Sequence, residues 1–211
     1  FGAGRGPPVP LPAMTELPVT HRTTVTEDQI DHLGHMNVRY YGLAARRASE
    51  AVVGPLGPHD GVEVEPVDVY TRHLREQLLG APLEVRSGVL APGPGTVRLY
   101  HELANTETGE LAATFVHRIE ARGAEGPVSD WQPALDGVAI ELPEGELIGW
   151  ANMESRMAMR RPVRAGTQIQ SFGATISVGD KVMHQVMWAF DLDRRDLVCT
   201  FEVVSLALDT V

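Results

Sequence analysis

Two reactive residue types are nearly missing from this chain of 211 residues, which contains one cysteine and one lysine. The lone cysteine, Cys199, rules out an intramolecular disulfide, and this suits a cytoplasmic location. It stands in the apolar run Leu197–Phe201. A buried structural thiol is predicted there, because a reactive thiol needs an electropositive and accessible setting. No apolar run approaches the roughly 20 residues that a membrane-spanning helix requires, so no membrane association is expected.

Positive charge is also scarce. The formal net charge is -10 at pH 7, and arginine supplies all but one of the 18 basic side chains. Nucleic-acid binding is not expected, because it depends on basic surface that displaces counterions from phosphates. Any anion that the chain does bind would meet the planar, bidentate guanidinium group.

The richest stretch in potential chemistry is Asp31–Asn37, which holds an acid, two imidazoles, a glycine and an amide in seven residues. A helix is predicted directly after it, capped by Asn37 and ended by the pair Gly54-Pro55. The first N–H groups of a helix have no partner within it and can hold a developing negative charge. A carboxylate just ahead of them is equipped to attack a polarised carbonyl group.

The rest of the chain is predicted to form antiparallel β-sheet. Short connections rich in glycine and proline separate the strands, and the pattern recurs after about 87 residues, near Gly80 and Gly166. The second copy has no acid-turn-helix segment, so one active site per chain is expected. The chain is predicted to begin with a disordered leader or cloning remnant (1–13), followed by the domain that contains the motif (14–121). A connection (122–146), with short structure around Trp131–Leu135, then leads to a diverged second half (147–211).

The segment Asp31–Tyr40, with the helix and hairpins after it, resembles the signature of the hot-dog fold, in particular the 4-hydroxybenzoyl-CoA thioesterase branch. The resemblance implies an α+β fold in which a twisted antiparallel sheet wraps a long central helix. The chain would be a double hot-dog whose second copy lacks a clear helix. It also implies that Asp31 is the nucleophile or the general base and that the N–H of Val38 polarises the carbonyl. Two positions depart from the branch: Val38 often corresponds to an asparagine, and Gln29 to an acid.

Each residue of the motif also has a simpler interpretation. Asp31 could cap a turn, and Asn37 could be a helix cap, a substrate contact or both. His35 either holds the turn by hydrogen bonds or acts as an acid or base. His32, His35 and Asp31 lack an obvious third partner for a metal, so neither a metal nor another cofactor is expected.

Four further residues are candidates for binding substrate. Tyr70 and Arg72 lie on a predicted strand and could face the substrate or form an ordinary strand surface. Tyr41 and Arg46 lie on the predicted helix, and Arg46 could meet the phosphates of coenzyme A or remain solvated.

These features favour a cytoplasmic thioesterase that cleaves an acyl-CoA, or an acyl-carrier-protein thioester, to the free acid. A homodimer of double hot-dog chains is expected. Two other functions stay open: an enoyl or hydroxyacyl thioester hydratase-dehydratase of the same fold, and a non-catalytic acyl-CoA-binding module.

Overall fold

The computed structural model describes residues 17–123, 126–127, 138–139, 153–178 and 182–206. The predicted leader 1–13 and the region Trp131–Leu135 lie outside these ranges. Within them the chain forms one α-helix, one short 3-10 helix and twelve strands. The elements are β1 (Val19–Thr24), η1 (Glu27–Gln29), α1 (Val38–Val53), β2 (Gly57–His59), β3 (Val62–His73), β4 (Pro82–Gly93), β5 (Thr96–Asn105), β6 (Leu111–Gly123), β7 (Gly126–Pro127), β8 (Val138–Ala139), β9 (Met153–Met159), β10 (Ile169–Val178), β11 (Val182–Asp191) and β12 (Asp196–Leu206).

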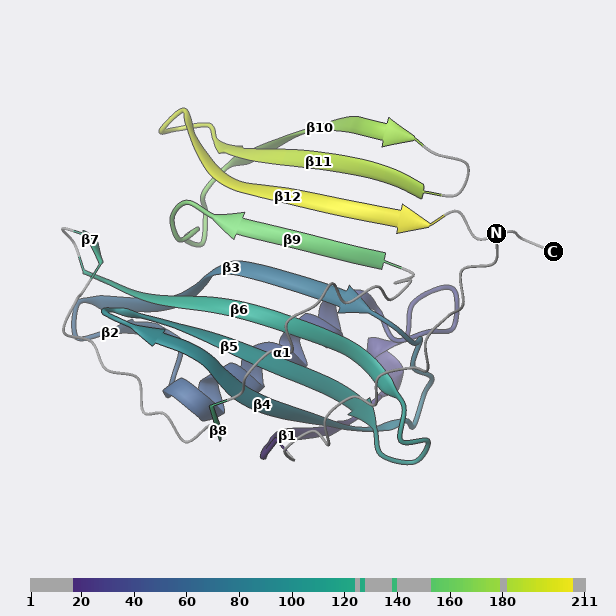
Figure 1. Ribbon diagram of the computed structural model, residues 1–211. Helices are drawn as coiled ribbons and strands as arrows, with labels where there is room; N and C mark the ends of the chain where they lie inside the picture. The colour runs from purple at the N-terminus through teal and green to yellow at the C-terminus, as the bar shows by residue number, and fades with distance from the viewer. Residues whose placement is uncertain (1–16, 124–125, 128–137, 140–152, 179–181, 207–211) are drawn as a thin grey trace, which may run out of the picture.

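The predicted helix is confirmed as α1, which begins after Asn37 and ends before Gly54. It lies across the concave face of the sheet formed by β1, β4, β5 and β6 (Figure 1). Small side chains line its buried face, which lets the helix backbone approach the strands closely. The buried residues of the helix are Tyr41, Ala44, Ala45, Ala48, Ser49, Val52 and Val53. Among the described residues, no helix has the length and apolarity that a membrane crossing would need.

The sheet is continuous and nearly symmetric about its middle. The strand order is β1-β4-β5-β6-β3-β9-β12-β11-β10. Read outward from the centre, β3-β6-β5-β4 on one side matches β9-β12-β11-β10 on the other. The duplication predicted from the sequence is therefore present as two half-sheets that meet where β3 pairs with β9.

Turn geometry repeats between the two halves with a constant spacing of 86 residues. The Oδ1 atom of Asn105 accepts the N–H groups two and three residues ahead, and Asp191 makes the same pair of contacts in its own turn. Gly80 and Gly166 occupy equivalent loops with φ of 84° and 86°, in the left-handed region that favours glycine. Bulges recur at the same spacing, after Val89 and Thr175. The stretch from Gly80 to Asn105 thus matches the stretch from Gly166 to Asp191 without a net insertion or deletion.

The pairing of β3 with β9 forms the seam between the halves. Tyr70 stands opposite Arg156, which is 86 residues later, so the pseudo-symmetry axis passes through this pair. Arg156 donates to the carboxylate of Asp68 at 2.6 and 3.1 Å, and Nε of Arg72 lies 3.1 Å from the carboxylate of Glu154. These ion pairs add charge complementarity to the backbone ladder that joins the two half-sheets.

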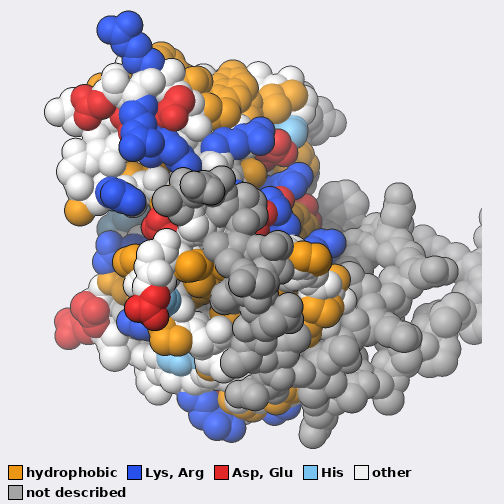
Figure 2. Space-filling view, turned by 90° about the vertical axis from the view of Figure 1, so that its left-hand side faces the viewer, with side chains coloured by type: hydrophobic (Ala, Val, Ile, Leu, Met, Phe, Trp, Pro, Cys, Tyr) orange, Lys and Arg blue, Asp and Glu red, His pale blue; other side chains and the backbone are white. Residues whose placement is uncertain are grey.

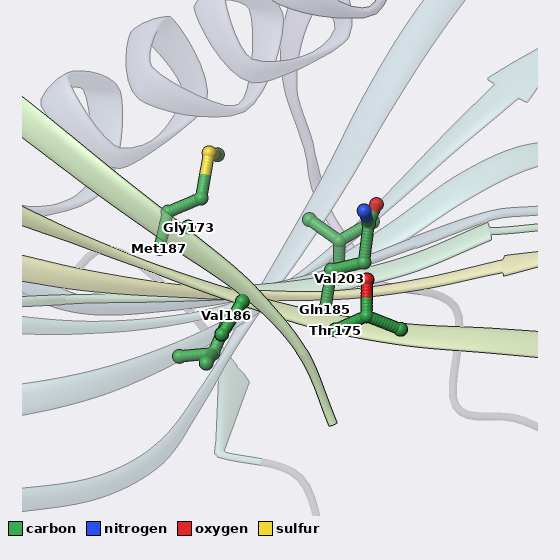
Figure 3. Close-up of a pocket in the computed structure, with 7 residues that line it drawn as sticks. Gly173, Thr175, Gln185, Val186, Met187 and Val203 are labelled. Carbon is green, nitrogen blue, oxygen red and sulfur yellow. The ribbon is translucent and has the colours of Figure 1, made fainter. Parts of the chain in front are cut away.

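The second half-sheet carries no helix among the described residues (Figure 1). Orange apolar side chains gather on that upper part of the molecule (Figure 2). Ile169 and Phe172 of β10 and Met187 of β11 are exposed. A hollow of about 290 Å³ lies on this half, lined by Gly173, Thr175, Gln185, Met187 and Val203 among others. Figure 3 shows Thr175, Gln185 and Val203 projecting to one side of the strands and Val186 to the other.

That hollow corresponds to the place of the helix in the first half. Shifted back by 86 residues, Gly173, Gln185, Met187 and Val203 coincide with positions on β4, β5 and β6 that α1 covers. Its described lining includes no titratable side chain. The hollow is therefore the counterpart, in the second half, of the sheet surface on which α1 packs in the first, and we assign it no catalytic role.

A buried polar network lies between α1 and the first half-sheet. The hydroxyl of Ser49 is 2.9 Å from Nε2 of His101 and 2.9 Å from Nδ1 of His117. Nδ1 of His101 is 2.7 Å from Ser87 Oγ, which lies 2.6 Å from Thr20 Oγ1. Burial, and secondarily the charge of Arg46, lower the pKa of His117 to about 4. Burial also holds the pKa of His101 well below its ordinary value, so both rings are neutral at pH 7.

This network predicts a loss of stability in mild acid. The unfolded histidine takes up a proton near its ordinary pKa of 6.5, whereas folded His117 resists protonation until about pH 4. The free energy of unfolding should therefore fall as pH drops from 6.5 to 4, by about 3 kcal/mol from His117 alone. Denaturant unfolding at several pH values measures this slope. The variant His117→Gln should flatten it, with the exposed His59→Gln as the matched control.

Candidate active site

The motif Asp31–Asn37 forms a tight loop between η1 and α1. Ile30 and Met36 pair across its base, and the N–H of Asp31 donates to the carbonyl of His35 at 2.8 Å. The chain reverses at Gly34, whose φ of 84° lies in the left-handed region that a side chain disfavours. The loop therefore holds Asp31 opposite His35, and the pairing of Gln29 with Asn37 at its base leads into the helix.

One oxygen of the Asp31 carboxylate is held by the loop itself. Oδ1 accepts the N–H of Leu33 at 2.9 Å and that of His35 at 3.4 Å. Within the described part of the chain, no group donates to Oδ2. The side chain is half-buried. One oxygen thus fixes the orientation of the carboxylate, and the other is available to a water molecule or a substrate carbon.

The N-terminus of α1, which follows this loop, lies at the surface of the described chain. The side chain of Asn37 accepts the N–H of Arg39 at 3.0 Å, which confirms Asn37 as the helix cap. Val38 is the first helical residue, so its N–H has no acceptor one turn earlier within the helix. Its side chain is half exposed. A carbonyl oxygen placed here would meet a free N–H and the positive end of the helix dipole.

Three residues that the sequence analysis missed anchor the motif loop. Nε2 of His35 lies 3.2 Å from a carboxylate oxygen of Glu76, and the N–H of Met36 donates to the carbonyl of Gln77 at 2.8 Å. The buried side chain of Gln77 in turn accepts from the amide of Asn105 at 2.9 Å. The loop between β3 and β4 and the turn after β5 therefore both support the motif.

A signal for these anchors was present in the repeat. At the spacing of 86 residues, Glu76 and Gln77 correspond to Pro162 and Val163, which cannot make the same contacts. The two copies diverge at the positions that hold the motif, and only the first copy has a motif to hold. Leu74, Leu78 and Leu79 also differ from their counterparts at this spacing, so the signal is weak.

A cavity of about 470 Å³ lies on the helix side of the seam. Its apolar walls come from both halves of the chain: Gly42 of α1, Val67 and Val69 of β3, and Met157 and Met159 of β9. The polar part of its lining consists of Arg46, Glu63, Glu65, His117, Glu120, Arg122 and Arg161. His117 pairs with Val69, and Val69 with Met157, so His117 lies level with the apolar walls.

The cavity contains one of the predicted substrate residues but not the motif. Arg46 lines it and donates to the carboxylate of Glu65 at 2.8 and 3.1 Å, a contact that raises the pKa of its guanidinium group. Asp31 and Val38 are not among the lining residues. Val38 nevertheless stands four and eight residues before Gly42 and Arg46, so all three share one flank of the helix.

The other predicted substrate residues lie elsewhere. Tyr41 is 3% exposed, with its ring against His73 and its hydroxyl donating to the carbonyl of Arg75 at 3.2 Å. Because His73 faces α1, the alternation of the strand directs Arg72 and Tyr70 to the opposite face of β3. The structure therefore directs Tyr70 and Arg72 away from the helix, and it places Tyr41 in the core cluster that also contains Met36 of the motif. Their contacts indicate roles in the core and at the seam.

A metal centre finds no support in the described residues, where no group of three or more His, Cys, Asp and Glu side chains is placed to hold an ion. The motif histidines are used differently. His35 pairs with Glu76, and His32 is exposed on the loop.

The chain matches no protein-family model and no curated protein sequence, but solved structures resemble it over nearly its whole length. A protein designated an oleoyl thioesterase from Lactobacillus plantarum is 10% identical, with a TM-score of 0.68 over 92% of this chain and 98% of that one. An acyl-ACP thioesterase from Bacteroides thetaiotaomicron is 9% identical, with a TM-score of 0.67 over 87% and 96%. The 12:0-ACP thioesterase from Umbellularia californica is 10% identical, with a TM-score of 0.66 over 87% and 92%. At these identities the likeness concerns architecture, and the chain has the double hot-dog fold.

Proposed function

We propose that this protein is a thioesterase that hydrolyses an acyl thioester, with Asp31 as the reacting carboxylate. The observation that carries the proposal is the Asp31 carboxylate, oriented through Oδ1 and without a donor to Oδ2 among the described residues, in the loop that leads into α1. The N–H of Val38, the first of the helix, has no acceptor in the same part of the chain. The architecture shared with acyl-ACP thioesterases supports it.

Two routes are chemically complete with these groups. In the first, Oδ2 of Asp31 takes a proton from water as the water oxygen attacks the thioester carbon. The oxyanion accepts the N–H of Val38, and its collapse breaks the C–S bond and returns the proton to the thiolate. In the second, the carboxylate attacks the carbon and expels the thiolate, and water then cleaves the mixed anhydride. Neither route draws on a metal or an organic cofactor.

The remaining predicted properties stay proposals. The leaving thiol belongs to coenzyme A or to a carrier protein, the latter being named in two of the structural neighbours. The exposed apolar side chains of the second half-sheet support a homodimer of double hot-dog chains, which the molar mass in solution would test. The division at residues 121 and 146, and the cytoplasmic location, also remain predictions.

Replacing Asp31 by Asn should abolish most of the turnover. The amide keeps an oxygen to accept the N–H groups of Leu33 and His35, so the loop should persist, but it can neither take a proton nor attack. Thiol release from a panel of acyl-CoAs and acyl-carrier proteins should fall by about 10²-fold or more. Asp28→Asn, on η1, is the matched control and should retain wild-type turnover.

Two other outcomes would point to other functions. Hydration of a crotonyl-type thioester without thiol release would identify a hydratase-dehydratase. Binding of acyl-CoA without any reaction, unchanged by Asp31→Asn, would identify a binding module. Either result would overturn the proposed hydrolysis.

The role of His35 can be separated by a pair of variants. If His35 only holds the loop through Glu76, His35→Ala and Glu76→Ala remove the same contact and should each lower kcat/KM by less than about tenfold, because a partly exposed pair contributes about 1 kcal/mol or less. An acid or base role would instead give a loss of about 10²-fold for His35→Ala alone. Steady-state thiol release distinguishes the two.

A further inference from the structure

His117 is the one imidazole that both belongs to the buried network and lines the cavity. Its hydrogen-bonding state follows from Ser49. The hydroxyl of Ser49 donates its single proton to the carbonyl of Ala45 at 3.1 Å. Ser49 must therefore accept from both rings, from Nε2 of His101 and from Nδ1 of His117.

This assignment leaves Nε2 of His117 as an unprotonated acceptor. The ring is neutral, because burial lowers the pKa of His117 to about 4. Across the described residues, no side chain or backbone group donates to Nε2. His101 is satisfied at both nitrogens, since Ser87 lies 2.7 Å from its Nδ1. An acceptor at the edge of a cavity, without a donor from the protein, can accept a hydrogen bond from a bound molecule.

The helix gives the scale of the path to this cavity, because Arg46 lines it together with His117. Val38, Gly42 and Arg46 follow one another along the flank of α1, and eight residues of helix advance about 12 Å. An extended chain advances about 1.2 Å per bond, so an acyl chain of about ten carbons would extend from the N–H of Val38 to the level of Arg46. Gly42 leaves the path open, because nothing lies within 4 Å of the place where a Cβ would stand.

The walls around His117 are apolar. Val67, Val69, Met157 and Met159 line the cavity, where methylene groups would lose contact with water. His117 pairs with Val69, and Val69 with Met157, so the ring lies level with these side chains. The charged groups of the lining have partners of their own, Arg46 with Glu65 and Arg122 with Glu120 at 2.6 Å. A plain alkyl group beside His117 would leave its acceptor without a donor.

We propose that the acyl group of the substrate is an apolar chain with a hydroxyl group at its far end, which donates a hydrogen bond to Nε2 of His117. This inference rests on the proposed thioesterase function and specifies its substrate class. His117 is then a specificity-determining residue, and the reaction itself stays with Asp31.

The test compares kcat/KM for 10-hydroxydecanoyl-CoA and decanoyl-CoA. The wild type should prefer the hydroxylated substrate by about tenfold, the scale of one hydrogen bond to an otherwise unpaired acceptor. In His117→Phe the ratio of the two kcat/KM values should fall to about one. The control His21→Phe changes a residue of β1, the strand at the outer edge of the first half-sheet, and should keep the wild-type ratio. A wild-type ratio near one, with turnover of both substrates, would overturn this inference and leave the hydrolysis intact. No turnover of either substrate would contradict the proposed function itself.

Two measurements avoid a dependence on the folding of His117→Phe. In the wild type, 10-hydroxydecanoate should inhibit with a Ki about tenfold below that of decanoate, and equal values would overturn the inference. The variant Gly42→Leu, a change that favours the helix, should block the path. It should lower kcat/KM for both ten-carbon substrates by about tenfold or more relative to butanoyl-CoA. An equal effect on all three substrates would show that the acyl chain does not pass Gly42.

Discussion

The backbone pairing of β3 with β9 makes one sheet out of two copies, and the architecture of the site follows from it. Seven residues of β9 would form only the edge of a small sheet without this contact. With it, Met157 and Met159 stand beside Val67 and Val69 and close a cavity that neither half could form alone. The second half, which has no motif of its own, therefore supplies part of the wall of this cavity.

Buried polar groups set a second constraint. The core between α1 and the sheet contains Ser49, His101 and His117, where a hot-dog core could have been filled with apolar side chains. Within the described residues, every polar side-chain atom of these three residues except Nε2 of His117 has a hydrogen-bond partner, which limits the cost of burial. The same matching fixes the tautomer of each ring and so determines which nitrogen faces the cavity.

The sequence was sufficient for the elements that local signals specify, although Cys199, predicted from its apolar run to be buried, is only half-buried. The cap at Asn37, the small-residue face of α1 and the glycine-rich turns are local, and the elements that they predict are confirmed. Local signals do not determine which face of a strand packs against the helix. Tyr70 and Arg72 were proposed as substrate contacts because their strand was recognised, but which face of β3 meets α1 depends on register and on a bulge after Pro66. Gln77 and Asn105 escaped notice because their contact joins loops 28 residues apart.

The central position of β3 also has a consequence for biosynthesis. Domains generally fold as the chain emerges, with N-terminal parts first. Strands β1 to β6 and α1 contain a complete core and can assemble while the rest is still on the ribosome. During that interval the outer edge of β3 presents unpaired N–H and C=O groups, which are a template for pairing with another chain. The nascent protein is thus exposed to mispairing between neighbouring chains until residue 159 is made. A close ribosome spacing on the message would favour swapped molecules in which one chain supplies β9 to another.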